Sequence, residues 1–511
     1  MKKIFGFFFF LIVGMGVAVF CLLFLRAPFD SYIGYPVGIV TLVCLFYPRK
    51  QSGKKNDKSG TQTQGKIKIE NFSWSINDFC RGWLITGWLI TGQTGSGKTA
   101  CAIRTILHAL FQNVPEWGGA IVDQKGQFYE IVDGIARHYG MEDKLCILRI
   151  GGDSLAKYNI LSYPGISWQS YAGIIIDTAE SMGIKLEAFW KSNSEQWLYG
   201  ILGLVASERT PTLADLVHYT YDNEALKALL KRASINKNLS REAQDAAQKV
   251  QGILELPAVT LGGVLGSVKT IINYFNDPAI QEVLCPKQNT VDFRDVDKGK
   301  IFVISMAQKY DRQRVFFNTF LKLLFMTHAK YRFDDPVNLP KKNLLVFFAD
   351  EAQQIVTSSV YASDHEAVSV IREAKATYVL ATQSVTSFLS RLKKEDVQTL
   401  VLNLSSKIYF TVADQEAAEL ASKDLGVFET EDISKSVSKG VETISTRKAE
   451  KAVYSAAELR SLNKYECVLK HPSGKTERMF LPPRDDSGNV PKYYYKDRFG
   501  LFWFIPWLFQ L

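Results

Sequence analysis

The sequence predicts an α/β fold interrupted by an all-α domain and preceded by two membrane-spanning helices. Three observations lead to this prediction. An uncharged apolar run of 22 residues, Ile4–Leu25, stands at the start of the chain. β-Prone apolar runs alternate with helical patterns over 67–164 and again over 291–485. Between these two regions, over 165–290, apolar residues recur at helical spacing. At 511 residues the chain is long enough for several domains.

Two apolar runs form the predicted transmembrane hairpin, residues 1–48. Ile4–Leu25 is long enough to cross a hydrocarbon core of about 30 Å as a helix, and Tyr32–Tyr47 is a shorter second run that crosses with little tilt. A secretory signal peptide is the competing interpretation, but the first run exceeds the usual apolar region of such a peptide and lacks a cleavage motif. Basic residues flank both sides of the hairpin, so both ends are expected on the cytoplasmic side.

The net charge of +9 is concentrated in the same part of the chain. Residues 1–66 contain nine basic and two acidic residues, which accounts for +7 of the +9. The rest of the chain is nearly neutral, which argues against a duplex-binding surface of clustered Lys and Arg. Residues 49–66 are polar and basic, as in a flexible linker. The seven cysteines and six histidines show no spacing typical of a disulfide framework or a zinc site.

The elements of the body follow from the apolar patterns. Strands are expected where short apolar runs end in polar residues: 301–305, 344–349, 377–381 and 407–411. Helices of the all-α domain are expected at 171–182, 195–206, 213–221 and 243–254. A tandem pentapeptide, WLITG at 83–87 and again at 88–92, indicates either a hairpin or an approach strand followed by a core strand.

The region after Ile433 is polar and rich in Ser and Lys, so a loop is expected there. Residues 486–511 are expected to form an aromatic C-terminal tail. Its last 13 residues, Phe499–Leu511, are too short to span a membrane and are expected to dock on the core, the membrane interface or a partner.

A phosphate-binding loop is the strongest functional signal. Residues 92–99 read GQTGSGKT, which satisfies the pattern GxxxxGK[ST] between a β-prone run and a helical run. Glycines in such a loop let backbone N–H groups turn toward a polyphosphate. Lys98 is expected to reach the β- and γ-phosphates of ATP, and Thr99 to ligate Mg²⁺. The predicted nucleotide-binding residues are Gly92, Gln93, Thr94, Gly95, Ser96, Gly97, Lys98, Thr99 and Ala100.

An acidic pair supplies the expected partner of this loop. The apolar run 344–349 ends in Asp350 and Glu351. Asp350 is expected to hold Mg²⁺ and Glu351 to polarise the attacking water. Adjacent side chains diverge on a strand, which suits two different roles. The alternative is a strand that ends in a solvated acidic turn.

Two further residues are candidates for catalysis. Gln383 follows the run 377–382, and an amide at a strand end beside the phosphates can sense the γ-phosphate; a turn-forming Gln fits equally well. Arg372 precedes that strand and is a candidate arginine finger at a subunit interface. A solvated helix face fits Arg372 equally well.

Taken in order, these motifs resemble the TraG/TraD-type coupling proteins of conjugation and type IV secretion, which are RecA/FtsK-like ATPases of the bacterial inner membrane. The resemblance covers about 67–485. It includes the phosphate loop, the sequence VDQKG at 122–126, similar to the family's D-x-K-G, and KYNIL at 157–161. It also includes the acidic pair and the stretch from Arg372 to Gln383.

The resemblance implies a homohexamer with ATP and Mg²⁺ bound between subunits and with the body in the cytoplasm. It implies that the all-α domain recognises substrates: single-stranded DNA bound to a relaxase, effector proteins, or both. These would be delivered to the channel subunits of a type IV secretion system. The sequence departs from the family in two places. The segment between the two spans, 26–31, is short, and the C-terminal tail is aromatic where some members have an acidic one. Candidate DNA contacts are 435–439 and 391–394, although each also fits a solvated loop.

Two other functions share the same core motifs. One is an FtsK/HerA-like DNA pump that is not linked to secretion. The other is a membrane scaffold whose nucleotide site is regulatory. The inserted all-α domain and the two-span anchor favour the coupling protein over the pump, and the acidic pair beside a complete phosphate loop favours hydrolysis over a scaffold.

Overall fold

The structure of the chain is a computed structural model that describes residues 76–499 except 155, 359–362 and 439–440. The predicted transmembrane hairpin (1–48), the linker (49–66) and the end of the aromatic tail (500–511) lie outside the described residues. The chain divides into two compact units, 1–63 and 64–511. Everything described below belongs to the second unit.

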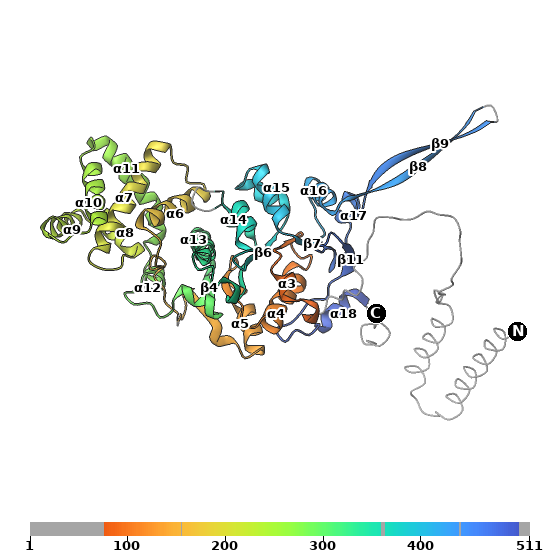
Figure 1. Cartoon of the computed structure of the whole chain (residues 1–511), viewed down its shortest axis with the longest axis horizontal. Coiled ribbons are helices and arrows are strands. Elements are labelled where there is room, and N and C mark those ends of the chain that lie inside the picture. The colour runs from red at the N-terminus through yellow and green to blue at the C-terminus, as the bar shows by residue number, and fades with distance from the viewer. Residues whose placement is uncertain (1–75, 155, 359–362, 439–440, 500–511) are drawn as a thin grey trace, which may run out of the picture. The chain divides into compact units, whose positions relative to one another are not determined.

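A nine-stranded sheet forms the centre of this unit (Figure 1). Its strand order is β11-β10-β7-β1-β6-β5-β2-β4-β3, and the seven strands from β7 to β3 are parallel. β10 and β11 add to one edge in antiparallel orientation. The strands are β1 (Trp88–Thr91), β2 (Gly118–Val122), β3 (Leu145–Ile150), β4 (Ile301–Met306), β5 (Leu345–Ala349), β6 (Ala376–Thr382), β7 (Ser406–Phe410), β10 (Glu466–Lys470) and β11 (Thr476–Phe480). A mostly parallel sheet with helical crossovers confirms the predicted α/β class.

Helices cover both faces of the sheet. Successive side chains of a strand point to opposite faces; on β5, for example, Phe347 joins one apolar cluster and Phe348 the other. The helices in and around the sheet are α3 (Arg81–Leu84), α4 (Arg104–Asn113), α5 (Phe128–His138), α13 (Asp311–Tyr331), α14 (Asp364–Ile371), α15 (Lys394–Asn403), α16 (Gln415–Leu425), α17 (Ala456–Arg460) and α18 (Lys492–Phe499). The shorter turns are η1 (Ile76–Asp78), η2 (Lys98–Ile103), η3 (Glu142–Lys144), η4 (Asn273–Phe275), η5 (Phe293–Lys298), η6 (Gln308–Tyr310), η7 (Arg332–Asp334), η8 (Leu339–Lys341), η9 (Ala352–Gln354) and η10 (Val385–Ser390).

The chain between β3 and β4 forms a helical segment, 168–284, drawn in yellow and green in Figure 1. It consists of α6 (Trp168–Ser181), α7 (Ala188–Ala206), α8 (Leu213–Tyr221), α9 (Asn223–Ile235), α10 (Arg241–Leu254), α11 (Ala258–Ile272) and α12 (Pro278–Leu284). Helices α6, α7, α8 and α10 occupy the expected positions, whereas α9, α11 and α12 were not expected. One apolar cluster runs without interruption from these helices to one face of the sheet. The domain boundaries at 165 and 290 therefore stay a prediction.

Side-chain caps fix where several of these helices begin. The side chains of Ser167, Asp222, Ser240 and Asp277 accept hydrogen bonds from backbone N–H groups in the first turns of α6, α9, α10 and α12. Thr212 and Asp215 form a reciprocal capping box at the start of α8. Such caps satisfy donors that have no partner within the helix and stabilise it by about 1 kcal/mol each.

The loop expected after Ile433 is a β-hairpin, so that prediction is wrong. β8 (Val427–Ser438) pairs with β9 (Val441–Ala452) in antiparallel register, from Val427–Ala452 to Ser438–Val441. The two strands form a sheet of their own that projects from the rest of the unit (Figure 1). Its sequence holds β-branched residues without the alternation that marks a half-buried strand, so the usual strand signal is missing.

The two WLITG copies adopt different structures, so neither a hairpin nor an approach strand forms. The first copy lies at the end of α3 and in the turn after it, and the second is β1. The first copy is held by tertiary contacts, because the indole N–H of Trp83 donates to Ser406 Oγ at 2.9 Å and the Thr86 hydroxyl hydrogen-bonds the same Ser406 hydroxyl at 2.7 Å.

Residues 484–494 pack on the core, whereas the docking predicted for Phe499–Leu511 falls on residues of which 500–511 are not described. Tyr494 of α18 is buried in the apolar cluster that contains α4 and α5. The backbone N–H of Arg484 donates to the Ala100 carbonyl at 2.9 Å, and the imidazole of His108 hydrogen-bonds the Asp485 carbonyl at 2.9 Å. Residues 484–494 therefore lie against the helix that follows the phosphate loop.

Within the described residues, one helical run has the length and composition to cross a membrane. It is Ala258–Phe275, with a mean hydropathy of 1.2. Val264, Val268, Ile271 and Ile272 of this run are buried in the cluster shared with the sheet, and most of its other residues are exposed or half-buried.

Candidate nucleotide-binding site

The predicted phosphate loop lies at the carboxyl edge of the sheet, between β1 and η2. Backbone bonds fix it to the ends of both neighbouring strands: Gly92 N–H donates to the Gln383 carbonyl at 3.1 Å and Gln93 N–H to the Thr411 carbonyl at 2.9 Å. Gly97 has a φ of +114°, in a region that favours glycine. A Cβ on Gly92 would stand 2.6 Å from Phe410 Cβ, so this position also requires glycine.

Lys98 folds back over the loop. Its ammonium donates to the carbonyls of Gly92 at 2.5 Å and Gln93 at 3.2 Å, and the residue is only 7% exposed. Burial lowers the pKa of Lys98, and the negative charges of Asp350 and Glu351 partly offset this effect. A buried cation inside a glycine-rich loop is suited to bind phosphate oxygens.

Thr99 and Asp350 meet beside this loop. β5 lies two strands from β1, and Thr99 Oγ1 donates to Asp350 Oδ2 at 3.1 Å. The structure thus brings together the two predicted metal ligands, an alcohol and a carboxylate, both of which are oxygen donors that suit Mg²⁺. Ser96 Oγ, in the loop itself, is buried and has no hydrogen-bond partner among the described residues. These groups fit a Mg²⁺-bound polyphosphate.

Glu351 does not diverge from Asp350, contrary to expectation. β5 ends at Ala349, and Glu351 has the left-handed backbone angles φ 55° and ψ 43°. Gln353 and Gln383 both donate to Glu351 Oε2, at 2.8 Å and 3.4 Å. Burial alone would raise the pKa of Glu351, but the hydrogen bond from Gln353 and the charge of Lys125 hold it below its usual value. The structure therefore places Gln383 beside Glu351.

Lys125 completes the cluster, and the sequence reasoning did not assign it to the site. Its ammonium lies 3.0 Å from Asp350 Oδ2 and 3.4 Å from Glu351 Oε1. These two carboxylates hold the pKa of Lys125 above its usual value, although burial alone would lower it. Buried Asp123 shapes the loop by accepting the N–H groups of Lys125 and Gly126 at 3.1 and 2.7 Å. The sequence VDQKG at 122–126 was the signal from which Lys125 could have been assigned to the site.

Arg372 lies at the opposite edge of the sheet. It follows the last residue of α14 and precedes β6, whereas Gln383 follows the other end of β6. The seven residues of β6 span roughly 23 Å at the rise of a strand. Arg372 is exposed and does not reach the phosphate loop of its own chain. Arg372 therefore does not act on the site of its own chain, and its two predicted roles, a finger at a subunit interface or a residue of a solvated helix face, stay predictions.

The candidate DNA contacts at 391–394 are partly structural. Leu392 is buried, and the Arg391 guanidinium donates to the Ser181 carbonyl at the end of α6. The other candidate, 435–439, falls on β8 and on a residue outside the described ones, so it is not on the predicted loop.

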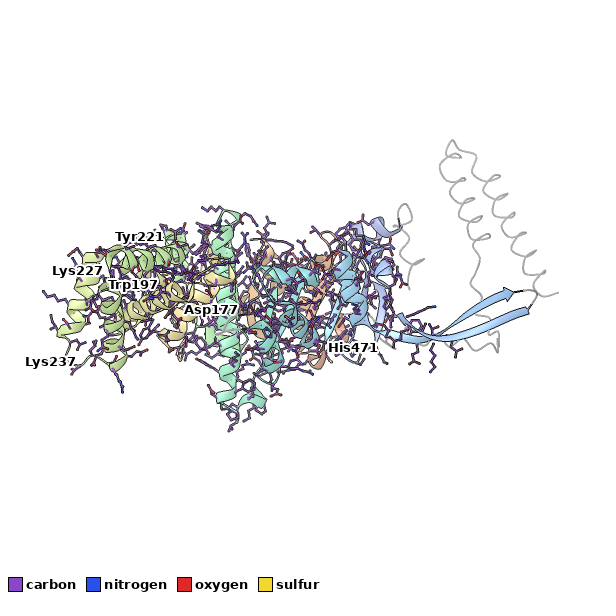
Figure 2. The ribbon with its side chains drawn as sticks, turned by 90° about the horizontal axis from the view of Figure 1, so that it is seen from above. Asp177, Trp197, Tyr221, Lys227, Lys237 and His471 are labelled. Atoms are coloured by element: carbon purple, nitrogen blue, oxygen red, sulfur yellow. The ribbon has the colours of Figure 1, made fainter. Side chains whose placement is uncertain are left out.

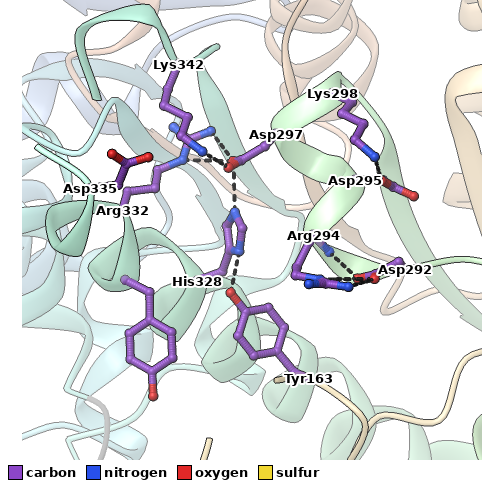
Figure 3. Close-up of a pocket in the computed structure, with 11 residues that line it drawn as sticks. Tyr163, Asp292, Arg294, Asp295, Asp297, Lys298, His328, Arg332, Asp335 and Lys342 are labelled. Atoms are coloured by element: carbon purple, nitrogen blue, oxygen red, sulfur yellow. Dashed lines mark hydrogen bonds and ion pairs between the residues drawn. The ribbon is translucent and has the colours of Figure 1, made fainter. Parts of the chain in front are cut away.

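A hollow at the amino edge of the sheet contrasts with the nucleotide site (Figure 3). Asp297 accepts bonds from Arg332 Nη2 and Lys342 Nζ, both at 2.6 Å, and from His328 at 2.9 Å; His328 in turn bonds the Tyr163 hydroxyl at 2.7 Å. The other ion pairs of this hollow are Arg294–Asp292 at 2.5 Å and Lys298–Asp295 at 2.7 Å. The hollow has four lysine and arginine side chains and four carboxylates, so its charges balance. This balance is typical of ion pairs that stabilise a fold.

Comparison with known families decides the identity. A model of the family described as type IV secretory system conjugative DNA transfer matches residues 50–469. The chain belongs to this family. It is a TraG/TraD-type coupling protein, as its motifs indicated. The curated protein sequences yield no match to the chain.

Solved structures of a coupling protein share this fold. The plasmid coupling protein TrwB in complex with the non-hydrolysable ATP analogue ADPNP is 18% identical, with a TM-score of 0.57; the similarity covers 80% of this chain and 89% of that one. TrwB in complex with ADP and Mg²⁺ is 17% identical, with a TM-score of 0.55 and the same coverage. At this identity the likeness shows the fold of the coupling protein.

Proposed function

We propose that the chain is a membrane-anchored ATPase that couples ATP hydrolysis to the recruitment and translocation of substrates through a type IV secretion system. The meeting of Thr99 and Asp350 beside the phosphate loop is the observation that carries this proposal. It supplies both protein ligands for a nucleotide-bound Mg²⁺, one from η2 after the phosphate loop and one from the residue that follows β5. TrwB structures hold ADPNP, or ADP with Mg²⁺, which are the ligands that this site fits.

Each residue of the site takes a role that its position supports. Lys98 and the loop amides bind the β- and γ-phosphates, while Thr99 and Asp350 hold Mg²⁺. Glu351, ionised by its surroundings, accepts a proton from the attacking water. Gln383 reports the γ-phosphate to Glu351 through their hydrogen bond. The bound Mg²⁺ neutralises charge that develops on the phosphates.

The proposal extends to the assembly and its cargo. Residues 1–48 anchor the chain in the bacterial inner membrane, with both ends and the ATPase body in the cytoplasm. Residues 67–164 and 291–485 form the motor, and 165–290 form the domain that meets substrates. Six copies form a ring in which Arg372 serves the adjacent subunit's nucleotide. The cargo is relaxase-bound single-stranded DNA, effector protein or both, passed to the channel subunits.

The test is the variant Lys98→Ala in the full-length, membrane-inserted chain. Because Lys98 is the cation of the phosphate loop, ATP hydrolysis and the transfer of plasmid DNA between cells are expected to fall to background. Membrane insertion, measured by fractionation, is expected to persist. Lys341→Ala, which removes an exposed lysine at the amino edge, is the matched control. Full ATPase activity in Lys98→Ala would overturn the site.

A further inference from the structure

A second hollow lies between the helical segment and the start of α13. It has a volume of about 620 Å³. One wall comes from α11 and η4, and the other from η6 and the first turn of α13. Its lining residues are Lys269, Thr270, Asn273, Tyr274, Lys309, Asp311, Arg312 and Gln313. We call this hollow the basic groove.

The basic groove carries uncompensated positive charge. Among the described residues, Lys269, Lys309 and Arg312 have no carboxylate within ion-pair distance. Its single carboxylate, Asp311, is paired with buried Arg314 at 2.6 Å. The amino-edge hollow of Figure 3, by contrast, balances each cation with a carboxylate. In a body whose net charge is close to zero, a groove with three cations that lack a carboxylate partner among the described residues is suited to bind an anion.

Aromatic and small polar side chains accompany these cations. The Lys269 ammonium lies 5.0 Å from the centre of the Tyr221 ring, which is half exposed. Tyr274 lines the groove and stacks on Phe316. Thr270, Asn273 and Gln313 add hydroxyl and amide groups. Cations that contact phosphates, donors of this kind and an aromatic ring in the lining, here Tyr274, are features of a groove for single-stranded nucleic acid.

The groove is also connected to the nucleotide site. Lys309 lies next to Gln308, whose side-chain amide donates to the Lys125 carbonyl. Lys125 in turn pairs with Asp350 and Glu351. The two loops touch closely, since a Cβ on Gly126 would stand 2.6 Å from the Met306 carbonyl. The segment that carries Lys309 therefore contacts the loop that carries Lys125.

We propose that the basic groove binds the phosphate backbone of single-stranded DNA, and that occupancy of the groove acts on ATP hydrolysis through the contact between Gln308 and Lys125. This inference deepens the proposed function and rests on it. The contacts are to backbone phosphates, so binding is independent of sequence and weakens as salt rises. Each subunit of a ring contributes one such groove.

The test is the triple charge reversal Lys269→Glu, Lys309→Glu and Arg312→Glu in the full-length chain. Affinity for a fluorescent thirty-nucleotide oligo(dT) is measured by anisotropy without ATP, at several salt concentrations. We expect at least a tenfold loss of affinity at low salt. The slope of log K against log salt is expected to fall by about 2, from three phosphate contacts at about 0.7 each. The stimulation of ATP hydrolysis by oligo(dT) is expected to disappear.

A matched control carries the same change of charge elsewhere. Lys227→Glu, Lys231→Glu and Lys237→Glu alter exposed lysines on and just after α9; Figure 2 labels Lys227 and Lys237. This control is expected to bind oligo(dT) and to respond to it as the wild type does. Loss of binding in both triples to the same extent would mean that only net charge matters, and would overturn the assignment.

Two other results would also overturn it. One is wild-type DNA affinity in the groove triple. The other is unchanged DNA affinity with loss of binding to a poly-glutamate peptide, which would assign the groove to an acidic protein segment. Failure of the proposed ATPase function is distinguished from both, because it appears as absent hydrolysis in the wild-type chain while DNA binding is measured without ATP.

Discussion

At the scale of single residues, the backbone of Glu351 explains how two adjacent carboxylates serve one site. A left-handed conformation costs a residue other than glycine about 1 kcal/mol or more. Here the Glu351 N–H donates to Asp350 Oδ1 at 3.0 Å, and the Glu351 carbonyl accepts the Gln354 N–H at 3.0 Å. These bonds hold the turn that brings both carboxylates to Lys125.

Glu351→Gln is expected to bind ATP and not to hydrolyse it. The amide keeps the size of the side chain but cannot accept a proton from water, so turnover is expected to fall by about 10²-fold or more. Hydrolysis and the affinity for a fluorescent ATP analogue are measured side by side. The control is Glu366→Gln, on the exposed side of α14. Turnover at the wild-type rate in Glu351→Gln would remove Glu351 from the role of base.

Lys125→Met is expected to change the pH dependence of hydrolysis. The charge of Lys125 helps to hold the pKa of Glu351 low, so its removal raises that pKa. A base acts only when ionised, and the acidic limb of the pH–rate profile is therefore expected to shift to higher pH by about one unit. Profiles of turnover between acidic and neutral pH check this, with Lys125→Arg as the variant that restores the wild-type limb. An unshifted limb in Lys125→Met would contradict the role of Lys125.

At the scale of elements, the Asp297 network joins η5 to α13 and to the turns before β5. Arg332 of η7 bonds Asp297 and also the carbonyls of Asn343 and Ala374, which precede β5 and β6. Burial alone would raise the pKa of Asp297, but the bond from His328 and the charge of Arg332 hold it well below its usual range.

Asp297→Asn is expected to lower the free energy of unfolding by roughly 3 kcal/mol at neutral pH, because it leaves buried Arg332 without its carboxylate. A carboxylate with a lowered folded-state pKa stabilises the fold above its unfolded value, about 3.9. The difference between the two proteins is therefore expected to shrink as the pH falls below about 4. Denaturant unfolding at several pH values measures this, with exposed Asp334→Asn as the control. An equal difference at pH 7 and pH 3 would contradict it.

The elements also show what the sequence allowed us to predict. The strands of the sheet and its α/β class followed from apolar runs such as 344–349, because buried strands require them. The phosphate loop and Asp350 followed from local patterns. The β8–β9 hairpin did not, since its sequence lacks the alternation of a half-buried strand. The structure of the first WLITG copy was not predicted for a different reason: its residues bond to Ser406, which is more than 300 positions away in the sequence. The placement of Lys125 likewise depended on the neighbouring strand β5.

At the scale of the whole molecule, the distance between Arg372 and the phosphate loop means that Arg372 could contribute only to the nucleotide site of another chain. If Arg372 serves an adjacent subunit, Arg372→Ala is expected to reduce turnover by roughly 10³-fold. A Lys98→Ala subunit still provides Arg372, and an Arg372→Ala subunit still provides the loop. Mixing the two inactive variants is therefore expected to restore part of the activity.

The measurement is ATP hydrolysis in co-assembled mixtures of the two variants at several ratios. In the control mixture, Arg241→Ala takes the place of Arg372→Ala. Arg241 is exposed on α10, and the Arg241→Ala variant is expected to be active by itself. Wild-type turnover by Arg372→Ala, or mixtures no more active than their components, would rule out the shared site.

The strand order determines how late in synthesis the nucleotide site can form. β1, which leads into the phosphate loop, pairs with β6 and β7, and Trp88 meets Val379, 291 positions later in the chain. At the usual pace of synthesis a ribosome needs on the order of 15–60 s to make that stretch. Until then, apolar β1 has no partner strand and the loop has no anchor at Gln383 or Thr411. ATP can therefore stabilise the protein only after the chain has been made as far as Thr411. Before that point, bound nucleotide does not contribute to the stability of the nascent chain.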